Sequence, residues 1–265
     1  MKYTLGFIGC GNMGGALVTA AAKTVAGQAI AVCNYNQAKA EKFHKQYGAN
    51  VVTAKDIAEN AEFVVLGVKP QVMGETIAPL AETLRARENV TVVTMAAGLS
   101  MSAIRGYIGK DVPVIRIMPN TPVALGAGMI LYATAGVGAD VEAKFLQAFA
   151  GAGVFDKIPE EKIDAGSALS GCGPAFVYAF AEALSDGGVE CGVPRDKAAL
   201  YAAQTLLGAA QMLLEFGHPA DLKDAVCSPG GTTIAGIHAL EEAGFRGAAM
   251  SAVTAAYKRT LELKK

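Results

Sequence analysis

A glycine-rich segment near the N-terminus constrains the fold more than any other feature of this sequence. It runs Gly9-Cys10-Gly11-Asn12-Met13-Gly14, directly follows the apolar run Leu5–Ile8 and opens a helical pattern. Glycines at this spacing allow a tight turn and a close backbone approach to a pyrophosphate, which N–H groups at the helix start then bind. The segment therefore predicts a strand–turn–helix unit that binds a dinucleotide. The alternative is a glycine-rich turn without a ligand.

Further apolar runs alternate with helical patterns up to Ile158, which predicts repeated strand–helix units and a mostly parallel sheet. The expected buried strands are Leu5–Ile8, Ile30–Cys33, Phe63–Val68, Thr91–Met95, Val114–Met118, Met129–Ala133 and Gly153–Asp156. The expected helices lie at 12–24, 36–47, 71–86, 101–108 and 140–149, with Gly48 ending the second. The fold class is thus α/β, with a Rossmann-type dinucleotide-binding domain expected over residues 1–158.

Residues 159–265 are expected to form a separate, all-helical domain. Its predicted helices lie near 161–187, 195–216, 219–226, 232–242 and 245–262. Within them, Ala198–Leu214 carries no charge and has apolar residues on every face, so this helix must be covered. A small helical domain has little to cover it with, which predicts an obligate dimer or larger oligomer in which a partner chain does so. The alternative is that the nucleotide domain covers it.

Composition and charge exclude several classes of protein. The chain has 265 residues, 52% of them hydrophobic, and a formal net charge of −1, which argues against disorder and against a nucleic-acid partner. Its five cysteines are an odd number without a C-x-x-C motif, so neither a disulfide framework nor a metal site is expected. The longest charge-free stretch, 117–139, contains two prolines and four glycines, which is not typical of a membrane span. Together these features favour a cytoplasmic protein with free thiols.

Polar and small residues follow several of the expected strands, where the carboxyl ends of a parallel sheet face the ligand crevice. Asn34 stands where NAD enzymes usually carry an acidic residue, and Lys39 and Lys42 follow nearby, which favours NADPH with NADH also accepted. Pro70 should hold Lys69 extended, facing cofactor or substrate, or simply solvated. The turn 96–98 leaves room for a flat ring, and 118–122 is either a ligand loop or a structural turn.

Two motifs of the helical half expose backbone N–H groups. The segment 170–176 opens an apolar helix, and 228–233 places two glycines and two threonines ahead of another. A loop of the second kind suits a carboxylate, while helix capping would explain one of its threonines. Cys172 has no histidine near it in sequence, so we do not expect a catalytic thiol.

Taken together, these motifs resemble those of the pyrroline-5-carboxylate reductase family over essentially the whole chain. The matching segments are Gly-Phe-Ile-Gly-Cys-Gly-Asn-Met-Gly at 6–14, Val-Lys-Pro-Gln at 68–71, Met-Pro-Asn-Thr-Pro at 118–122, Ser-Gly-Cys-Gly-Pro-Ala-Phe at 170–176 and Leu-Lys-Asp-Ala-Val-Cys-Ser-Pro-Gly-Gly-Thr-Thr-Ile at 222–234. The resemblance implies reduction of 1-pyrroline-5-carboxylate to L-proline with NAD(P)H. It also implies an intertwined helical dimer and, in some members, a decamer of five dimers.

The resemblance also implies site residues. The cofactor-binding residues would be Ile8, Gly9, Cys10, Gly11, Asn12, Met13, Gly14, Asn34, Val68, Lys69, Pro70, Ala96, Ala97 and Gly98. The substrate-binding residues would be Ser228, Gly230, Gly231, Thr232, Thr233, Asn120 and Glu160, with the Thr233 hydroxyl near the imine nitrogen as the catalytic group. The chain departs from the family at Cys172, often Ser, and at Tyr35 and Ala225, which are Arg and Asn in some members.

Two other functions remain open. A 3-hydroxyacid dehydrogenase of similar architecture needs a general base. This base is often a Lys in the helix that follows the glycine-containing segment 170–176, and residues 177–181 of that helix include no Lys. A non-catalytic oligomer that senses a dinucleotide and binds a partner protein would use the same glycine-rich segment.

Overall fold

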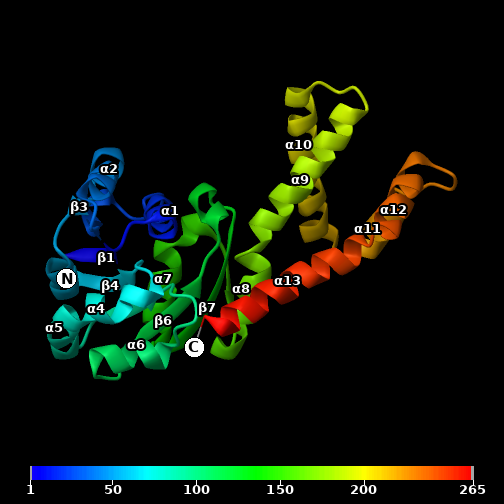
Figure 1. Cartoon of the computed structure of the whole chain (residues 1–265). Coiled ribbons are helices and arrows are strands. Elements are labelled where there is room, and N and C mark those ends of the chain that lie inside the picture. Colours follow the sequence, from blue (N-terminus) through cyan, green and yellow to red (C-terminus); the bar gives the residue numbers. More distant parts are fainter. Residues whose placement is uncertain (1, 264–265) are drawn as a thin grey trace. The chain divides into compact units, whose positions relative to one another are not determined.

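The computed structural model describes residues 2–263, which divide into two compact units. The first unit holds 2–172 and 257–263, and the second is Gly173–Ala256. Helix α13 (Phe245–Glu262) spans the division. We describe each unit by itself (Figure 1).

The described part of the first unit contains an eight-stranded sheet in the order β3-β2-β1-β4-β5-β6-β7-β8. The strands are β1 (Tyr3–Ile8), β2 (Ile30–Cys33), β3 (Asn50–Val51), β4 (Ala61–Leu66), β5 (Thr91–Thr94), β6 (Val114–Met118), β7 (Gly128–Ala135) and β8 (Gly153–Lys157). Neighbouring strands pair in parallel except β6 and β7, which are antiparallel. The mostly parallel sheet of the predicted α/β class is confirmed. The chain order reverses direction across β1, so that β1 lies between β2 and β4.

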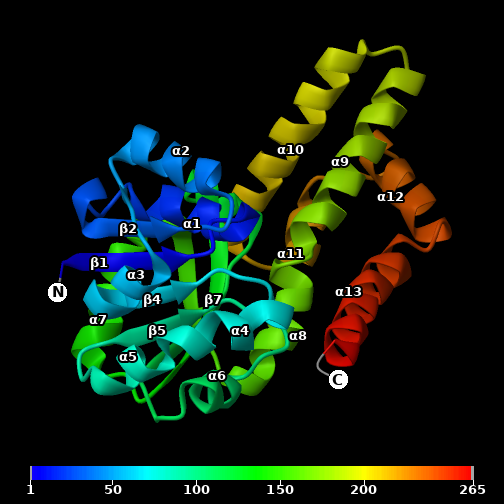
Figure 2. The same cartoon turned by 60° about the vertical axis from the view of Figure 1, so that its left-hand side comes forward.

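Helices cover both faces of this sheet (Figure 2). They are α1 (Asn12–Ala21), α2 (Gln37–Tyr47), α3 (Ala54–Asn60), α4 (Met73–Ile77), α5 (Ala81–Ala86), α6 (Met101–Ile108), α7 (Ala139–Ala148) and α8 (Glu160–Ser170). Short 3₁₀ turns join them at η1 (Gly27–Ala29), η2 (Pro70–Val72), η3 (Ala78–Leu80), η4 (Thr121–Leu125) and η5 (Ala150–Ala152).

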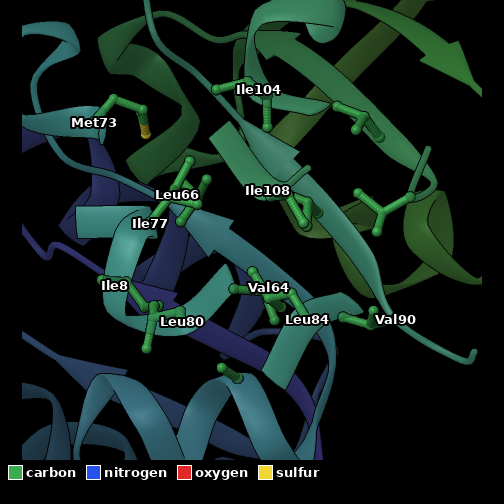
Figure 3. Packing of buried hydrophobic residues seen from close by; sticks show 14 of the residues in the cluster. Ile8, Val64, Leu66, Met73, Ile77, Leu80, Leu84, Val90, Ile104 and Ile108 are labelled. Atoms are coloured by element: carbon green, nitrogen blue, oxygen red, sulfur yellow. The ribbon is translucent and has the colours of Figure 1, made fainter. Parts of the chain in front are cut away.

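Alternate side chains of each strand enter two separate cores, as the two-residue period of a strand requires. On β4, for example, Val64 and Leu66 pack with α3 to α6, whereas Phe63 and Val65 pack with α1 and α7. Figure 3 shows part of the first core, in which Ile77 and Ile104 from two helices meet these strands. Both faces are therefore buried, which explains why the strands are continuous apolar runs.

Three sequence expectations for the helices and strands were wrong. The helix expected at 71–86 is broken into η2, α4, η3 and α5, because Pro79 cannot donate a backbone hydrogen bond. The helix expected at 161–187 is two helices, α8 and α9 (Gly173–Glu190), separated at Gly171 and Cys172. Strand β3 and helix α3 were not expected, since both are short.

The second unit is helical. It holds α9, α10 (Arg195–Phe216), α11 (Pro219–Ala225), α12 (Thr232–Glu242) and the first part of α13. Helices α9 and α10 pack along each other, and the rings of Phe180 and Phe245 lie 5.4 Å apart. In α10, only Ala198 and Ala202 are buried within the chain, and all the large apolar side chains of this helix except Leu206 are exposed.

Candidate active site

The glycine-rich segment lies at the carboxyl end of β1, beside the point where the strand order reverses. In doubly wound sheets this is where ligands bind. Gly9 has a φ of +99° and its N–H donates to the Cys33 carbonyl oxygen (2.8 Å). A Cβ at Gly14 or Gly67 would overlap the Gly9 carbonyl oxygen, so the ends of β1 and β4 and the start of α1 can approach this closely only as glycines.

Helix α1 begins with its N–H groups uncapped. Its N-cap is Gly11, no side chain caps the helix, and its first turn has no acidic residue. Both the orphan N–H groups and the partial positive charge of the helix are therefore available to a phosphate. This is the geometry that the glycine spacing predicts.

A cavity of about 370 Å³ lies between helices α1 and α2, which lie side by side in Figures 1 and 2. Gly11 and Thr19 line it from α1, and Lys39 and Lys42 line it from α2. The two cations make this end of the cavity suitable for a second anionic group. Lys69, by contrast, lies after β4 with an exposed side chain and the extended backbone (φ −66°, ψ 148°) expected before Pro70.

Asn34 holds two loops together. Its Oδ1 accepts a hydrogen bond from the Cys10 N–H (2.8 Å), and its Nδ2 donates to the Asn36 carbonyl oxygen (2.9 Å). The amide therefore joins the glycine-rich segment to the start of α2. Tyr35 beside it is fully exposed.

The turn Ala96–Ala97–Gly98 follows β5 at the same end of the sheet as the glycine-rich segment. Its first N–H is held by Thr94 Oγ1 (3.3 Å), and Gly98 has a φ of +77°, which favours glycine. Thr94, itself fully buried, was not among the sequence-based candidates; a hydroxyl within an apolar strand is the signal that marks it.

Asn120 and Glu160 are both hydrogen-bonded inside the first unit. Asn120 Nδ2 donates to the Ser170 carbonyl oxygen (3.0 Å) and its Oδ1 accepts from the Met129 N–H (3.0 Å). Glu160 Oε1 accepts from the Met101 N–H (2.7 Å) and lies 3.5 Å from an Arg116 nitrogen. Arg116 was not singled out from the sequence, although a charge inside a buried strand signals a partner elsewhere.

In the second unit, an exposed loop at 228–230 leads through Gly231 into α12. Gly230 has a φ of +69°, and the Gly231 N–H donates to the Ser228 carbonyl oxygen (3.0 Å). Gly231 is the N-cap, so neither Thr232 nor Thr233 caps the helix, and both are exposed. The alternative explanation, in which one threonine caps the helix, therefore does not hold. Both hydroxyls and the first N–H groups of α12 are available to a ligand.

Three other features bear on function. Burial raises the pKa of the Cys10 thiol to about 12, so it is protonated at neutral pH and is not a nucleophile. Among residues 2–263, no three His, Cys, Asp or Glu side chains are placed to hold a metal ion. Within the same range, no helix combines the length and apolar character of a membrane span.

Family models match both parts of the chain. Residues 4–98 match "NADP oxidoreductase coenzyme F420-dependent", and residues 160–263 match "Pyrroline-5-carboxylate reductase dimerisation". A pyrroline-5-carboxylate reductase from Glycine max is 40% identical over 268 residues, covering 99% of this chain and 96% of that protein.

Solved structures agree over the full length. The chain is similar to a pyrroline-5-carboxylate reductase from Coxiella burnetii (TM-score 0.90, 32% identity, 100% of both chains). It is also similar to a Plasmodium falciparum pyrroline carboxylate reductase with NADP bound (TM-score 0.88, 28% identity, 100% of both chains).

Proposed function

The chain belongs to the pyrroline-5-carboxylate reductase family, and on that premise we propose how its own residues bind NADPH and 1-pyrroline-5-carboxylate. The enzyme reduces this cyclic imine to L-proline, the last step of proline biosynthesis, with NADPH as the reductant. NADPH supplies the hydride for the imine carbon. The residues of the chain then have three tasks, which are to bind the cofactor, to bind the substrate carboxylate and to form a hydrogen bond with the imine nitrogen.

The observation that carries the cofactor assignment is the uncapped start of α1 against the packed glycines 9, 14 and 67. We assign the pyrophosphate to these N–H groups, because a helix N-terminus without a capping side chain attracts an anion. Lys39 and Lys42 in the adjoining cavity then pair with the 2′-phosphate. The neutral Asn34 places no negative charge there, which supports NADPH while allowing NADH.

We assign the substrate carboxylate to the N-terminus of α12. Gly230, Thr232 and Thr233 offer N–H groups there, whereas the Gly231 N–H donates to the Ser228 carbonyl oxygen. The helix brings no acidic residue of its own to its first turn. To the Thr233 hydroxyl we assign the hydrogen bond with the imine nitrogen. A protonated imine is already electrophilic, so alignment and anchoring supply most of the catalysis, and effects of this kind are worth ~7–11 kcal/mol.

The family's dimerisation region covers α8 to α13, and we propose that a second copy of the chain covers the exposed apolar side chains of α10. A dimer, and a decamer built from five dimers, both fit this assignment. We also propose a cytoplasmic location, consistent with five free cysteines.

The decisive experiment follows the absorbance of NADPH during turnover of 1-pyrroline-5-carboxylate, and repeats it with NADH. We expect turnover with both and a higher kcat/KM with NADPH. NAD-dependent oxidation of a hydroxy acid would instead favour the dehydrogenase, and tight cofactor binding without turnover would favour the sensing function.

Thr233→Ala tests the catalytic assignment. We expect kcat to fall about 100-fold or more, because the hydrogen bond to the imine nitrogen is lost, while the Kd for NADPH stays the same. Thr233→Ser keeps the hydroxyl and should retain most of the activity. An unchanged rate in Thr233→Ala would remove this residue from the site.

A further inference from the structure

The turn 96–98, which the family resemblance implies as part of the cofactor site, is held at both ends. At its start, the Ala96 N–H donates to the buried Thr94 hydroxyl (3.3 Å). At its end, the chain passes directly into α6, whose N-cap is Ser100. The position of the turn therefore depends on where the first turn of α6 is fixed.

The first turn of α6 has one hydrogen-bond acceptor from its own sequence and one from a distant segment. Ser100 Oγ accepts from the Ala103 N–H (3.1 Å), as an N-cap serine normally does. The helix has no acidic residue in its first turn. Glu160 Oε1, from the start of α8, accepts from the Met101 N–H at 2.7 Å instead. It supplies both the missing acceptor and a negative charge for the positive end of the helix.

Glu160 is itself held by a buried charge. Arg116 on β6 is 3% exposed and places one nitrogen 3.5 Å from Glu160 Oε1 and another 2.6 Å from Asp164 Oδ1. Asp164 lies about one helical turn after Glu160 on α8 and is 2% exposed. The buried Arg116–Asp164 pair thus fixes α8 against the sheet, and Glu160 extends the contact from α8 to α6.

We propose that Glu160 is a positioning residue, which holds the cofactor-binding turn 96–98 in place through the Met101 N–H. The inference rests on the proposed function, because it takes NADPH as the cofactor and takes from the family resemblance that the turn is part of the cofactor site. It differs from the expectation that Glu160 contacts the substrate, since Oε1 is engaged by α6. A pre-positioned turn costs less to order when the cofactor binds, so the effect falls on NADPH affinity.

Three substitutions separate the acceptor from the charge. Glu160→Gln keeps an oxygen at the same reach but removes the charge. Glu160→Asp keeps the charge beside Arg116 but withdraws the oxygen by one methylene. Glu160→Ala removes both. Glu161→Ala, at the next and exposed position of α8, is the matched control.

The measurements are the Kd for NADPH from its fluorescence, KM for each substrate and kcat. We expect Glu160→Ala and Glu160→Asp to raise the Kd for NADPH about tenfold, and Glu160→Gln to restore it to within about threefold of wild type. KM for 1-pyrroline-5-carboxylate should change less than about twofold in all three, and Glu161→Ala should match wild type.

Two results would overturn the inference. If Glu160→Asp keeps a normal KM for 1-pyrroline-5-carboxylate while Glu160→Gln and Glu160→Ala raise it, the carboxylate charge acts on the substrate. If every variant keeps the wild-type Kd for NADPH and changes only the melting temperature, Glu160 is merely structural. Because the fluorescence titration needs no turnover, absence of turnover in the wild type would refute the proposed function and leave this test intact.

Discussion

At the scale of single residues, two asparagines that the sequence analysis places in the binding site also hold segments of the chain together. Asn34 joins the glycine-rich segment to α2, and Asn120 joins the start of β7 to the end of α8. Sequence predicts that such residues lie near the site, because they follow strands that end there. It does not predict which backbone groups they bind, since those partners come from distant segments. Lys39 and Lys42 of α2 are a different case, because both side chains line a cavity.

Lys39→Ala and Lys42→Ala should each raise KM for NADPH about tenfold and leave KM for NADH nearly unchanged, because NADH lacks the 2′-phosphate that the lysines pair with. Steady-state kinetics with both nucleotides check this. Lys45→Ala, on the same helix but outside the cavity lining, is the control. An equal rise in KM for NADH would show that the lysines do not bind the 2′-phosphate.

Cys10 should make the protein less stable in alkali. Burial raises the pKa of its thiol from 9.0 to about 12, so above pH 9.0 the unfolded chain releases a proton that the folded chain retains. The free energy of unfolding should therefore fall by about 1.4 kcal/mol per pH unit between these values, with no slope from this group below them.

Urea unfolding at about pH 8 and about pH 10 measures this slope. Cys10→Ala should flatten it, whereas Cys191→Ala, an exposed thiol, should not. Burial also raises the pKa of Tyr132 to about 12. Because Tyr132 is present in every variant, its contribution to the slope cancels in the comparison. Identical slopes in Cys10→Ala and wild type would contradict the prediction.

At the scale of helices and strands, periodicity predicts the long elements well because they are long. The helix expected at 195–216 is α10 to the residue, and Gly48 ends α2 with a φ of +71°. Short elements cannot be predicted in this way. Strand β3, for example, has two residues, which are too few to show an alternation of apolar and polar side chains. Contacts between helices and strands also cannot be predicted from periodicity, because no residue near Arg116 in the sequence indicates that its partner lies on α8.

Asp164→Ala should destabilise the protein by about 3–5 kcal/mol, because it leaves the buried Arg116 guanidinium without its closest carboxylate. Chemical denaturation gives the value. The control is Asp186→Ala, which breaks an exposed ion pair with Arg195 and should cost less than about 1 kcal/mol. Similar losses in the two variants would mean that burial does not determine the worth of the Arg116 pair.

At the scale of the whole molecule, the two units bury their apolar residues very differently. The sheet of the first unit has a core on each face, whereas the second unit leaves large apolar side chains exposed along its helices. On α10 alone, these are Leu200, Tyr201, Leu207, Met212, Leu213, Leu214 and Phe216. An apolar surface of this kind is typical of an interface between subunits.

We therefore expect no folded monomer of 27.1 kDa at micromolar concentration, and sedimentation velocity would resolve a dimer from a decamer. Leu207→Glu, which places a charge among these side chains, should shift the protein toward smaller species or unfold it. Lys45→Glu, on the surface of the first unit, should leave the assembly unchanged. A compact 27.1 kDa wild-type species would refute the obligate oligomer.

The meeting of Gly9, Gly14 and Gly67 also determines how freely this enzyme can be redesigned. Each of these positions is closed to every side chain, since even a methyl group at Gly14 or Gly67 would collide with the Gly9 carbonyl oxygen. Efforts to exchange one nicotinamide cofactor for the other, whether by directed evolution or by natural drift, must leave that junction intact. Their variation can fall instead on residues 35–42, which lie outside the junction, whereas Asn34 is tied to the glycine-rich segment by its hydrogen bond from the Cys10 N–H.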